Sequence, residues 1–386
     1  MTKINKILVI GAGIAGPSMC YWLKKFGFSP TLIDNAPAIR KGGQALDIRG
    51  VAVQLVKEMG IYEDICNRRT QIERCDLVDT TGKLLHQEQG ERGGFRQGDE
   101  VEIVRGDLVD ILMSTIKDVP VHFNKSVQSV KEHDNGVTVE FKDGSIEEYD
   151  LMIGADGIHS ATRRMVFDKD VYQLINLGSY ISIFTIPNYL KLNHSEILCE
   201  ANQKHVSITN DHDKNTASAG FMFRSSRILH NIRDKDEQMQ FLRETFTDFG
   251  WETKKMLELM PDSHDFYFDS ITQVKMDSWV KGRVALLGDA GYCASPLSGQ
   301  GNNLALVGAY ILAGELNESE GDYKHAFSRY DKLLRSFVKV TQEFGAWVSE
   351  SFLIDGELSK DVAEERSNLI LRKIKAVANG IELPNY

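Results

Sequence analysis

The chain opens with hydrophobic residues in two successive patterns, one typical of a strand and one of a helix. Residues 6–11, KILVIG, form a short β-branched apolar run of the kind found in buried parallel strands. The next stretch carries apolar residues at helical spacing and stops at Gly27, where glycine suits a helix C-cap. Residues 30–34 predict a second strand. Strand, glycine turn, helix and strand make a βαβ unit, so we expect a parallel, doubly wound α/β sheet.

Shorter elements of both kinds follow up to residue 155. The turn signals Asn135-Gly136 and Asp143-Gly144 each lie between alternating segments, which is typical of hairpins. The expected elements are, in order, a helix at 51–60, a hairpin at 72–88, a glycine-rich loop at 90–99, a strand at 101–104 with a following helix, and an antiparallel meander at 121–155.

The remaining pattern predicts a second sheet and then helices. Residues 171–279 mix alternating segments with a charged helix near 234–248, so we expect an inserted sheet domain. From Tyr323 to Val348 apolar residues recur every three or four positions, which predicts one long helix. A second amphipathic helix is expected at 359–379, with these residues on one face: Val362, Leu369, Ile370, Ile374 and Val377. We expect this last helix to gate the substrate site; the alternative is an ordinary packing helix.

Composition narrows the class of protein. The chain has 386 residues, enough for two domains, and a formal net charge of −10. An acidic chain lacks the basic face of a nucleic-acid binder. The apolar run at 304–314 is shorter than the ~20 residues that span a bilayer. We therefore expect a soluble, cytoplasmic protein with neither a nucleic-acid nor a membrane partner, and we expect a monomer.

Cysteine and histidine usage excludes further classes. The five cysteines are scattered without a C-x-x-C pair, which is typical of a reducing compartment without a disulfide framework. The ten histidines show no metal-ligand spacing, so no metal site is expected. Lys3 and Lys6 before an apolar run also resemble a secretory signal, but the glycine spacing within that run has a better explanation.

That explanation is Gly11-Ala12-Gly13-Ile14-Ala15-Gly16, a G-x-G-x-x-G motif between a strand and a helix. Gly11 permits the tight turn, Gly13 lets the backbone approach a pyrophosphate, and Gly16 lets helix and strand pack closely. The phosphates would lie at the positive N-terminus of the helix. Asp34, after the second strand, suits a ribose 2′-hydroxyl and would repel a 2′-phosphate. We therefore expect the motif to bind FAD or NAD rather than NADP. The alternative is that its glycines only form a turn and bind no cofactor.

Two further motifs favour FAD. Asp156-Gly157 follows the apolar strand at 151–155, and Gly288-Asp289 follows another at 283–287. Asp289 is placed to accept hydrogen bonds from ribityl hydroxyls. The stretch 288–301 is too rich in glycine to predict a helix or a strand.

A bare loop in that stretch suits a flat ring system. Its backbone from Pro296 through Gly299 to Gly301 carries few large side chains and would let an isoalloxazine approach closely. The alternative is that the side chains are small only so that the loop can pack against the rest of the protein. The helix expected to begin near Asn302 would point its positive end at the ring, which stabilises the negative charge of a reduced flavin.

Together, the three motifs resemble those of the group A flavoprotein monooxygenases, which share the para-hydroxybenzoate hydroxylase fold. The resemblance extends from residue 11 to residue 303. It implies that Asp289 holds the ribityl chain and that Asp156 and Gly157 lie near the pyrophosphate. It also implies that Arg105, after VEIV, contacts FAD; the alternative is a surface arginine at a helix start.

Within that family the chain is most similar to the TetX-like, tetracycline-inactivating enzymes, the tetracycline destructases. Gly42-Gly43-Gln44-Ala45-Leu46-Asp47 resembles their glycine-rich segment after the second strand, whose aspartate contacts FAD. Arg40 matches an arginine implied in NADPH binding. The C-terminal helices resemble their bridging and gatekeeping helices. Two residues depart from the family pattern: Tyr292 stands where many relatives have histidine, and Gly308 where many have aspartate.

The resemblance implies the reaction. NADPH or NADH reduces FAD, O₂ adds to give a flavin C4a-hydroperoxide, and one oxygen atom passes to a polycyclic phenol or enol, with a tetracycline as the expected substrate. The cofactor carries this chemistry, so no catalytic side chain is expected. Two alternatives stay open: an FAD-dependent oxidase or dehydrogenase without oxygen insertion, and a flavin-bound interaction protein.

The expected architecture is α/β: a Rossmann-like FAD-binding domain with an inserted mixed-sheet substrate domain and C-terminal helices. The predicted boundaries are 1–70, 101–170 and 280–318 for the FAD-binding domain, 71–100 and 171–279 for the substrate-binding domain, and 319–386 for the bridging and gatekeeping helices.

Overall fold

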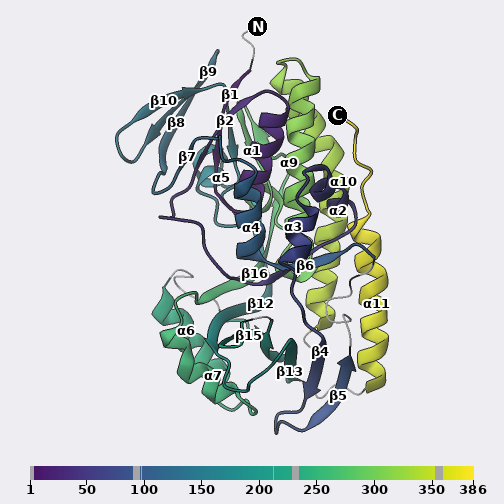
Figure 1. Cartoon of the computed structure of the whole chain (residues 1–386). Helices are drawn as coiled ribbons and strands as arrows, with labels where there is room; N and C mark the ends of the chain where they lie inside the picture. Colours follow the sequence, from purple (N-terminus) through teal and green to yellow (C-terminus); the bar gives the residue numbers. More distant parts are fainter. Residues whose placement is uncertain (1–3, 90–95, 97, 212, 228–233, 353–359) are drawn as a thin grey trace.

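Two sheets of different type form the body of the protein, which we describe from a computed structural model (Figure 1). The structure describes residues 4–89, 96, 98–211, 213–227, 234–352 and 360–386. The predicted loop at 90–99 lies mostly outside these residues. In Figure 1 the sheet that contains β1 occupies one end of the molecule and the sheet that contains β15 the other, and the long helix α10 runs past both.

The first sheet has six strands and is parallel except at one edge. Its strand order is β17-β18-β11-β1-β2-β7, and only β17 runs antiparallel to its neighbour. The strands are β1 (Lys6–Ile10), β2 (Ser29–Ile33), β7 (Val121–His122), β11 (Leu151–Gly154), β17 (Val280–Lys281) and β18 (Val284–Leu286). The buried apolar runs predicted as strands are therefore the centre of a doubly wound sheet, as expected.

Helices from distant parts of the chain cover this sheet. They are α1 (Ala15–Lys25), α2 (Val51–Glu58), α3 (Tyr62–Asn67), α4 (Arg105–Ser114), α5 (Ala161–Val166) and α9 (Gly301–Glu318). Helix α1 packs on α9, which is buried over nearly its whole length. The predicted end of α1 at Gly27 is confirmed: the C-cap is Phe26, and Gly27 follows it with a φ of 85° and donates its N–H to the Lys24 carbonyl at 2.9 Å.

Two smaller sheets lie beside the first one. The predicted hairpins form the antiparallel sheet of β8 (Val127–His133), β9 (Gly136–Phe141) and β10 (Ile146–Tyr149). The other pairs β3 (Ala45–Ile48) with β6 (Val101–Val104). This pairing brings the glycine-rich segment after β2 next to the start of α4, where Arg105 lies.

The second large sheet has seven strands in the order β16-β12-β15-β14-β13-β4-β5. It joins the predicted hairpin, β4 (Arg74–Val78) and β5 (Leu84–Gln89), to strands from the middle of the chain. These are β12 (Tyr172–Pro187), β13 (Ser195–Ala201), β14 (Lys204–Asn210), β15 (Thr216–Arg224) and β16 (Tyr267–Met276). One face packs an aromatic cluster under α6 (Lys235–Thr245) and α7 (Thr253–Leu259). The domain boundaries themselves stay a prediction.

The C-terminal helices are α10 (Tyr323–Phe352) and α11 (Lys360–Ala378). In α11 the side chains of Ile370, Ile374 and Val377 are buried, mainly against α10, but Leu369 of the predicted apolar face is 41% exposed. The side chain of Val362, also predicted on this face, lies outside the described part of the structure. A Cβ at Gly50 would overlap the Ala378 carbonyl, which shows how closely the end of α11 packs on α2. This half of α11 is therefore part of the core, and its gating role stays a prediction.

One local expectation was wrong. The stretch 288–301 contains a short helix, α8 (Asp289–Tyr292), and a 3₁₀ turn at Pro296–Ser298. Gly288, with a φ of 64°, supplies the turn into α8, so glycine here begins a helix rather than preventing one. None of the helices within the described ranges combines the length and apolar character needed to cross a membrane. The five cysteines are free thiols.

Candidate functional site

The glycine turn after β1 has the geometry that dinucleotide binding requires. Gly11 has a φ of 109°, and a Cβ there would overlap the Ala155 carbonyl; a Cβ at Gly16 would overlap the Gly11 carbonyl. Around Gly13 there is room instead, since the nearest atom to a Cβ would be the Arg105 Nη2 at 3.7 Å. The N–H groups of Gly13 and Ile14 donate no hydrogen bond within the described part of the chain. The start of α1, with Ala15, thus offers free donors to an anion.

Asp34 follows β2 and braces this turn. Its carboxylate accepts from the Ala12 N–H and from the Ala36 N–H, both at 2.7 Å. Each carboxylate oxygen keeps a second lone pair, so the residue can still accept a ribose hydroxyl. Its predicted contact with the ribose stays a prediction, and its bracing of the turn is an additional role.

Arg105 lies at the start of α4, opposite the glycine turn. The segment before β3 holds it in place, because the Gln44 carbonyl accepts from the Arg105 N–H at 3.0 Å. Burial lowers the pKa of the guanidinium, the nearby Arg40 lowers it further, and Asp289 and Asp34 oppose the shift. Among the described residues its guanidinium forms no hydrogen bond or ion pair. A half-buried cation in this position suits a phosphate or another polar part of a dinucleotide.

The second motif organises its own helix. The Asp156 carboxylate accepts from the Ser160 Oγ at 2.5 Å and from the Thr162 N–H at 2.9 Å, at the start of α5. Its side chain is therefore already engaged, which leaves the backbone around Gly157, with a φ of 75°, to face a cofactor. Buried Arg163 donates to the carbonyls of Ile158 at 2.6 Å and Ala290 at 2.7 Å. Sequence reasoning missed this link between the second and third motifs.

The third motif places Asp289 at the start of α8, with its side chain exposed. Its side chain keeps contact with solvent, while Gly288 and Ala290 on either side are buried. Enough protein surrounds it that burial raises the pKa of its carboxyl, against the effect of Arg105. A Cβ at Gly301 would lie 3.9 Å from the Asp289 Oδ1. The carboxylate and the N-terminus of α9, which has no side-chain cap, therefore face the same space.

Asn302 connects the start of α9 to the segment after β2. Its Nδ2 donates to the Asp47 carbonyl at 2.8 Å. Gly299, with a φ of 59°, lies beside α11, since a Cβ there would be 3.5 Å from the Ile374 Cδ1. Pro296 is exposed. The predicted flavin loop thus touches the last helix on one side and β3 on the other.

Charged side chains form a network around β3 and β6. The Asp47 carboxylate pairs with Arg49 at 2.7 Å and with Arg96 at 3.1 Å, so its implied contact with FAD would compete with two cations. Arg96 also pairs with Glu102 at 3.0 Å, which accepts a hydrogen bond from the Thr70 hydroxyl. Burial, and then repulsion from Asp47, raises the pKa of Glu102 to about 7. No sequence pattern pointed to Glu102, because these partners come from separate segments.

Replacing Glu102 by glutamine should remove a pH dependence of stability. A raised pKa means that the folded protein binds a proton that the unfolded chain releases above pH about 4.5, so the stability contributed by protonated Glu102 is lost as pH rises through about 7. At pH 8 we expect the Glu102→Gln variant to be more stable than the wild type by about 1–3 kcal/mol, and at pH 5 nearly equal. Urea unfolding at both pH values measures this. Glu258→Gln, on an exposed part of α7, is the control. A stability difference between the Glu102→Gln variant and the wild type that stays the same at both pH values would contradict the prediction.

The face of the seven-stranded sheet opposite α6 and α7 is half-exposed. In β15 the buried residues alternate with Ser218, Gly220 and Met222, which define what we call the open face. Paired positions continue this face onto β12 with Ile183 and onto β16 with Tyr267. Asp289 raises and Arg105 lowers the pKa of the Tyr267 hydroxyl, so this end of the open face lies near the third motif and the start of α4.

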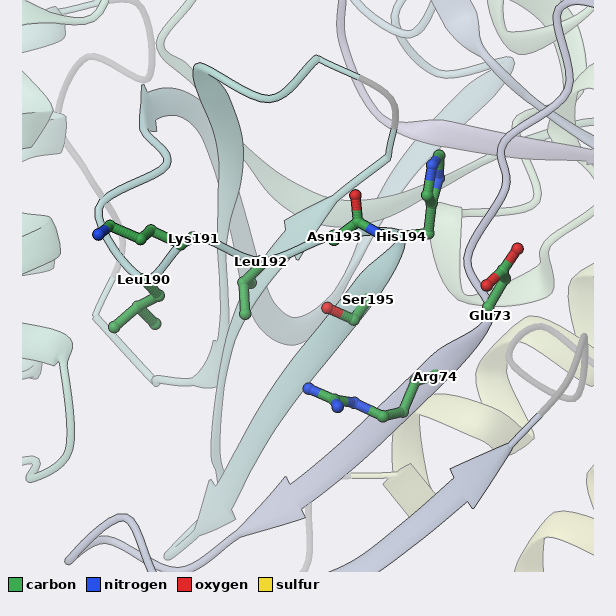
Figure 2. A pocket seen from close by; sticks show the side chains of 8 residues that line it. All are labelled: Glu73, Arg74, Leu190, Lys191, Leu192, Asn193, His194 and Ser195. Atoms are coloured by element: carbon green, nitrogen blue, oxygen red, sulfur yellow. The ribbon is translucent and has the colours of Figure 1, made fainter.

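A separate hollow of about 740 Å³ lies at the β12–β13 connection (Figure 2). Its lining includes Glu73 and Arg74 near the start of β4, together with Lys191 and His194. The residues of the three motifs do not line it, so it is not the predicted flavin site. Within the described ranges no three histidine, cysteine or acidic side chains are grouped as a metal ion would require.

Comparisons with known proteins agree with this geometry. Residues 5–324 match the family described as "FAD binding domain". A flavin-dependent monooxygenase of Legionella longbeachae serogroup 1 (strain NSW150) is 65% identical over the whole chain and 99% of its own length. The crystal structure of tetracycline destructase Tet(55) aligns with a TM-score of 0.95, 57% identity and full coverage of both chains. That of Tet(51) aligns with a TM-score of 0.93 and 61% identity over 99% of this chain and all of its own.

The residues present fit FAD. Gly11 and Gly16 leave no room for a side chain, and Gly13 leaves open space above the backbone. Free N–H groups at the starts of α1 and α9, together with the Asp289 carboxylate and the Arg105 guanidinium, match the polar groups of that cofactor. The family match covers this whole region. This chain belongs to the FAD-binding-domain family, and it is an FAD-dependent monooxygenase.

Proposed function

We propose that this enzyme consumes NADPH or NADH and O₂ to hydroxylate a polycyclic phenolic or enolic substrate, and that the substrate is a tetracycline. The observation that carries the proposal is the similarity to two tetracycline destructases over the entire chain, at 57–61% identity, which includes both the open face and α11. The alternatives without oxygen insertion lose support, because the relatives are monooxygenases.

The roles of this chain's own residues follow from their positions. The turn at Gly11–Gly16 would bind the pyrophosphate, and Asp289 and Arg105 would orient the rest of the dinucleotide. When bound, FAD supplies the exchange of electrons and the activation of oxygen. The start of α9 would stabilise negative charge on the reduced ring. The open face would orient the substrate. Helix α11, which lies beside Gly299, would cover the site and keep water from the oxygen that is transferred.

The proposal is tested with the purified holoenzyme. NADPH consumption is measured with a panel of tetracyclines and simple phenols, and mass spectrometry follows oxygen from isotopically labelled O₂ into each product. We expect oxygen incorporation with tetracyclines and little with small phenols. Flavin reduction without oxygen incorporation would support an oxidase instead, and product from phenols alone would overturn the substrate class.

Arg40 offers a test of nicotinamide preference. It is exposed, and its charge affects the pKa of Arg105, so it lies at the rim of the cofactor site. If Arg40 binds the 2′-phosphate of NADPH, Arg40→Ala should raise KM for NADPH about 3- to 10-fold and leave KM for NADH unchanged, since an exposed charge pair contributes modestly. Lys41→Ala is the matched control. Equal changes for the two nucleotides would show that Arg40 does not recognise this phosphate.

We also propose that the enzyme acts in the cytoplasm as a monomer. Free cysteines persist in that reducing compartment, which also supplies reduced nicotinamide.

A further inference from the structure

Tyr267 is the first residue of β16 and projects from the open face of the seven-stranded sheet. It pairs with Ile183, which in turn pairs with Gly220 of the open face. The next residue, Phe268, points the other way and packs in the aromatic cluster, 5.7 Å from the Tyr180 ring centre. Because successive side chains in a strand alternate between faces, the Tyr267 ring lies on the side of the FAD motifs.

The surroundings of Tyr267 come from three separate elements. Asp269 lies on the same strand, Asp289 begins α8, and Arg105 begins α4. Burial raises the pKa of the Tyr267 hydroxyl, the two carboxylates raise it further, and Arg105 opposes them. The hydroxyl therefore stays protonated at working pH and acts as a hydrogen-bond donor. Asp269 is held by His159 at 3.0 Å and by the Ser270 N–H at 2.8 Å.

Two polar groups near Asp289, the Tyr267 hydroxyl and the Arg105 guanidinium, share one property. Across the part of the chain that the structure describes, neither the Tyr267 hydroxyl nor the Arg105 guanidinium forms a hydrogen bond, although both residues are half-buried. Since neither group is committed to a protein partner, both can bind a ligand. A ligand that lies along Asp289 and reaches the glycine turn would pass Arg105, whose Nη2 would lie 3.7 Å from a Cβ at Gly13, and the electrostatic effect of Asp289 on Tyr267 places the hydroxyl near the same ligand.

We propose that Tyr267 is a cofactor-positioning residue, whose hydroxyl donates a hydrogen bond to an oxygen of the ribityl–pyrophosphate part of FAD, on the side opposite the glycine turn. The second sheet thus contributes directly to cofactor binding, and not only to the substrate wall. The inference rests on FAD as the cofactor and is independent of which substrate is hydroxylated.

The conservative variant Tyr267→Phe tests this, because it keeps the ring and removes only the hydroxyl. Apoprotein is titrated with FAD, and the quenching of flavin fluorescence gives Kd. We expect Kd to rise about 3- to 10-fold, the loss of one hydrogen bond. Tyr189→Phe, in the aromatic cluster on the covered face of the same sheet, should leave Kd unchanged.

A double-mutant cycle with Arg105→Lys adds a second readout. If both side chains hold the same stretch of FAD, their effects on Kd should be coupled rather than multiplicative. An unchanged Kd for Tyr267→Phe with a raised substrate KM would overturn the proposal and assign Tyr267 to the substrate wall. An equal rise in Kd for Tyr189→Phe would overturn it too, because the effect would then come from the sheet as a whole.

Discussion

Replacing Asp289 by alanine is expected to weaken FAD binding about 10- to 100-fold. The residue lies where the buried strand β18 ends, faces the start of α9, and has surroundings that already disfavour its charge. A carboxylate kept in such a place needs partners, and ribityl hydroxyls supply them. Losing charge-assisted hydrogen bonds costs about 1.5–3 kcal/mol, which corresponds to that change in Kd.

The measurement is the FAD content of the purified variant together with Kd from fluorescence titration of the apoprotein. Asp289→Asn keeps the shape and one acceptor, so we expect it to fall between alanine and the wild type. Asp168→Ala removes an exposed carboxylate that pairs with Lys281 and serves as the control. Full flavin occupancy of Asp289→Ala at sub-micromolar concentration would remove Asp289 from the cofactor site.

The sequence pattern was most informative where local sterics dictate structure. The glycine turn between β1 and α1, the end of α1 at Gly27 and the β9–β10 hairpin at Gly144 all have a positive φ that few residue types tolerate. The FAD-binding family and the monooxygenase activity were also anticipated correctly from three motifs far apart in the chain.

Contacts between distant segments were not predictable in this way. Arg163, for example, donates to the Ala290 carbonyl and so links the second motif to the third. The role of Asp156 at the cofactor stays a prediction; the structure adds that its carboxylate accepts hydrogen bonds at the start of α5. Tyr267 and Glu102 carry no local signal, because their neighbours come from strands and helices elsewhere in the chain. The one indication for Tyr267 was its place next to Phe268. Because successive side chains of a strand point to opposite faces, a buried Phe268 puts Tyr267 on the other face of the sheet.

The two departures from the family pattern, Tyr292 and Gly308, prove to be one feature of the packing. Tyr292 is fully buried on α8, and its hydroxyl bonds to the Tyr330 hydroxyl at 3.0 Å, which itself donates to the Leu286 carbonyl at 3.0 Å. A Cβ at Gly308 would overlap the Tyr292 hydroxyl and lie 3.0 Å from the Leu287 Cδ1. Glycine in the middle of α9 therefore makes room for the larger tyrosine.

This complementarity predicts an effect of unusual sign. Alanine for glycine inside a helix normally stabilises by about 1 kcal/mol. At position 308 we expect Gly308→Ala to destabilise the protein by about 2–4 kcal/mol, because the added methyl group must displace Tyr292 and break its buried hydrogen bond. Tyr292 shares α8 with Asp289, so FAD retention should fall as well.

The rescue variant separates this cause from a general loss of packing. Tyr292→Phe removes the hydroxyl that the new methyl group would meet, and Tyr330 keeps its bond to the Leu286 carbonyl. Alone, Tyr292→Phe should cost about 1 kcal/mol; combined with Gly308→Ala, the total should be smaller than the sum of the two single effects by 1 kcal/mol or more, at about the scale measured for residues in contact. Urea unfolding of the four proteins at fixed FAD concentration gives the coupling. Strict additivity would show that Gly308 is constrained by its other neighbours, Leu287 and Leu334, and not by Tyr292.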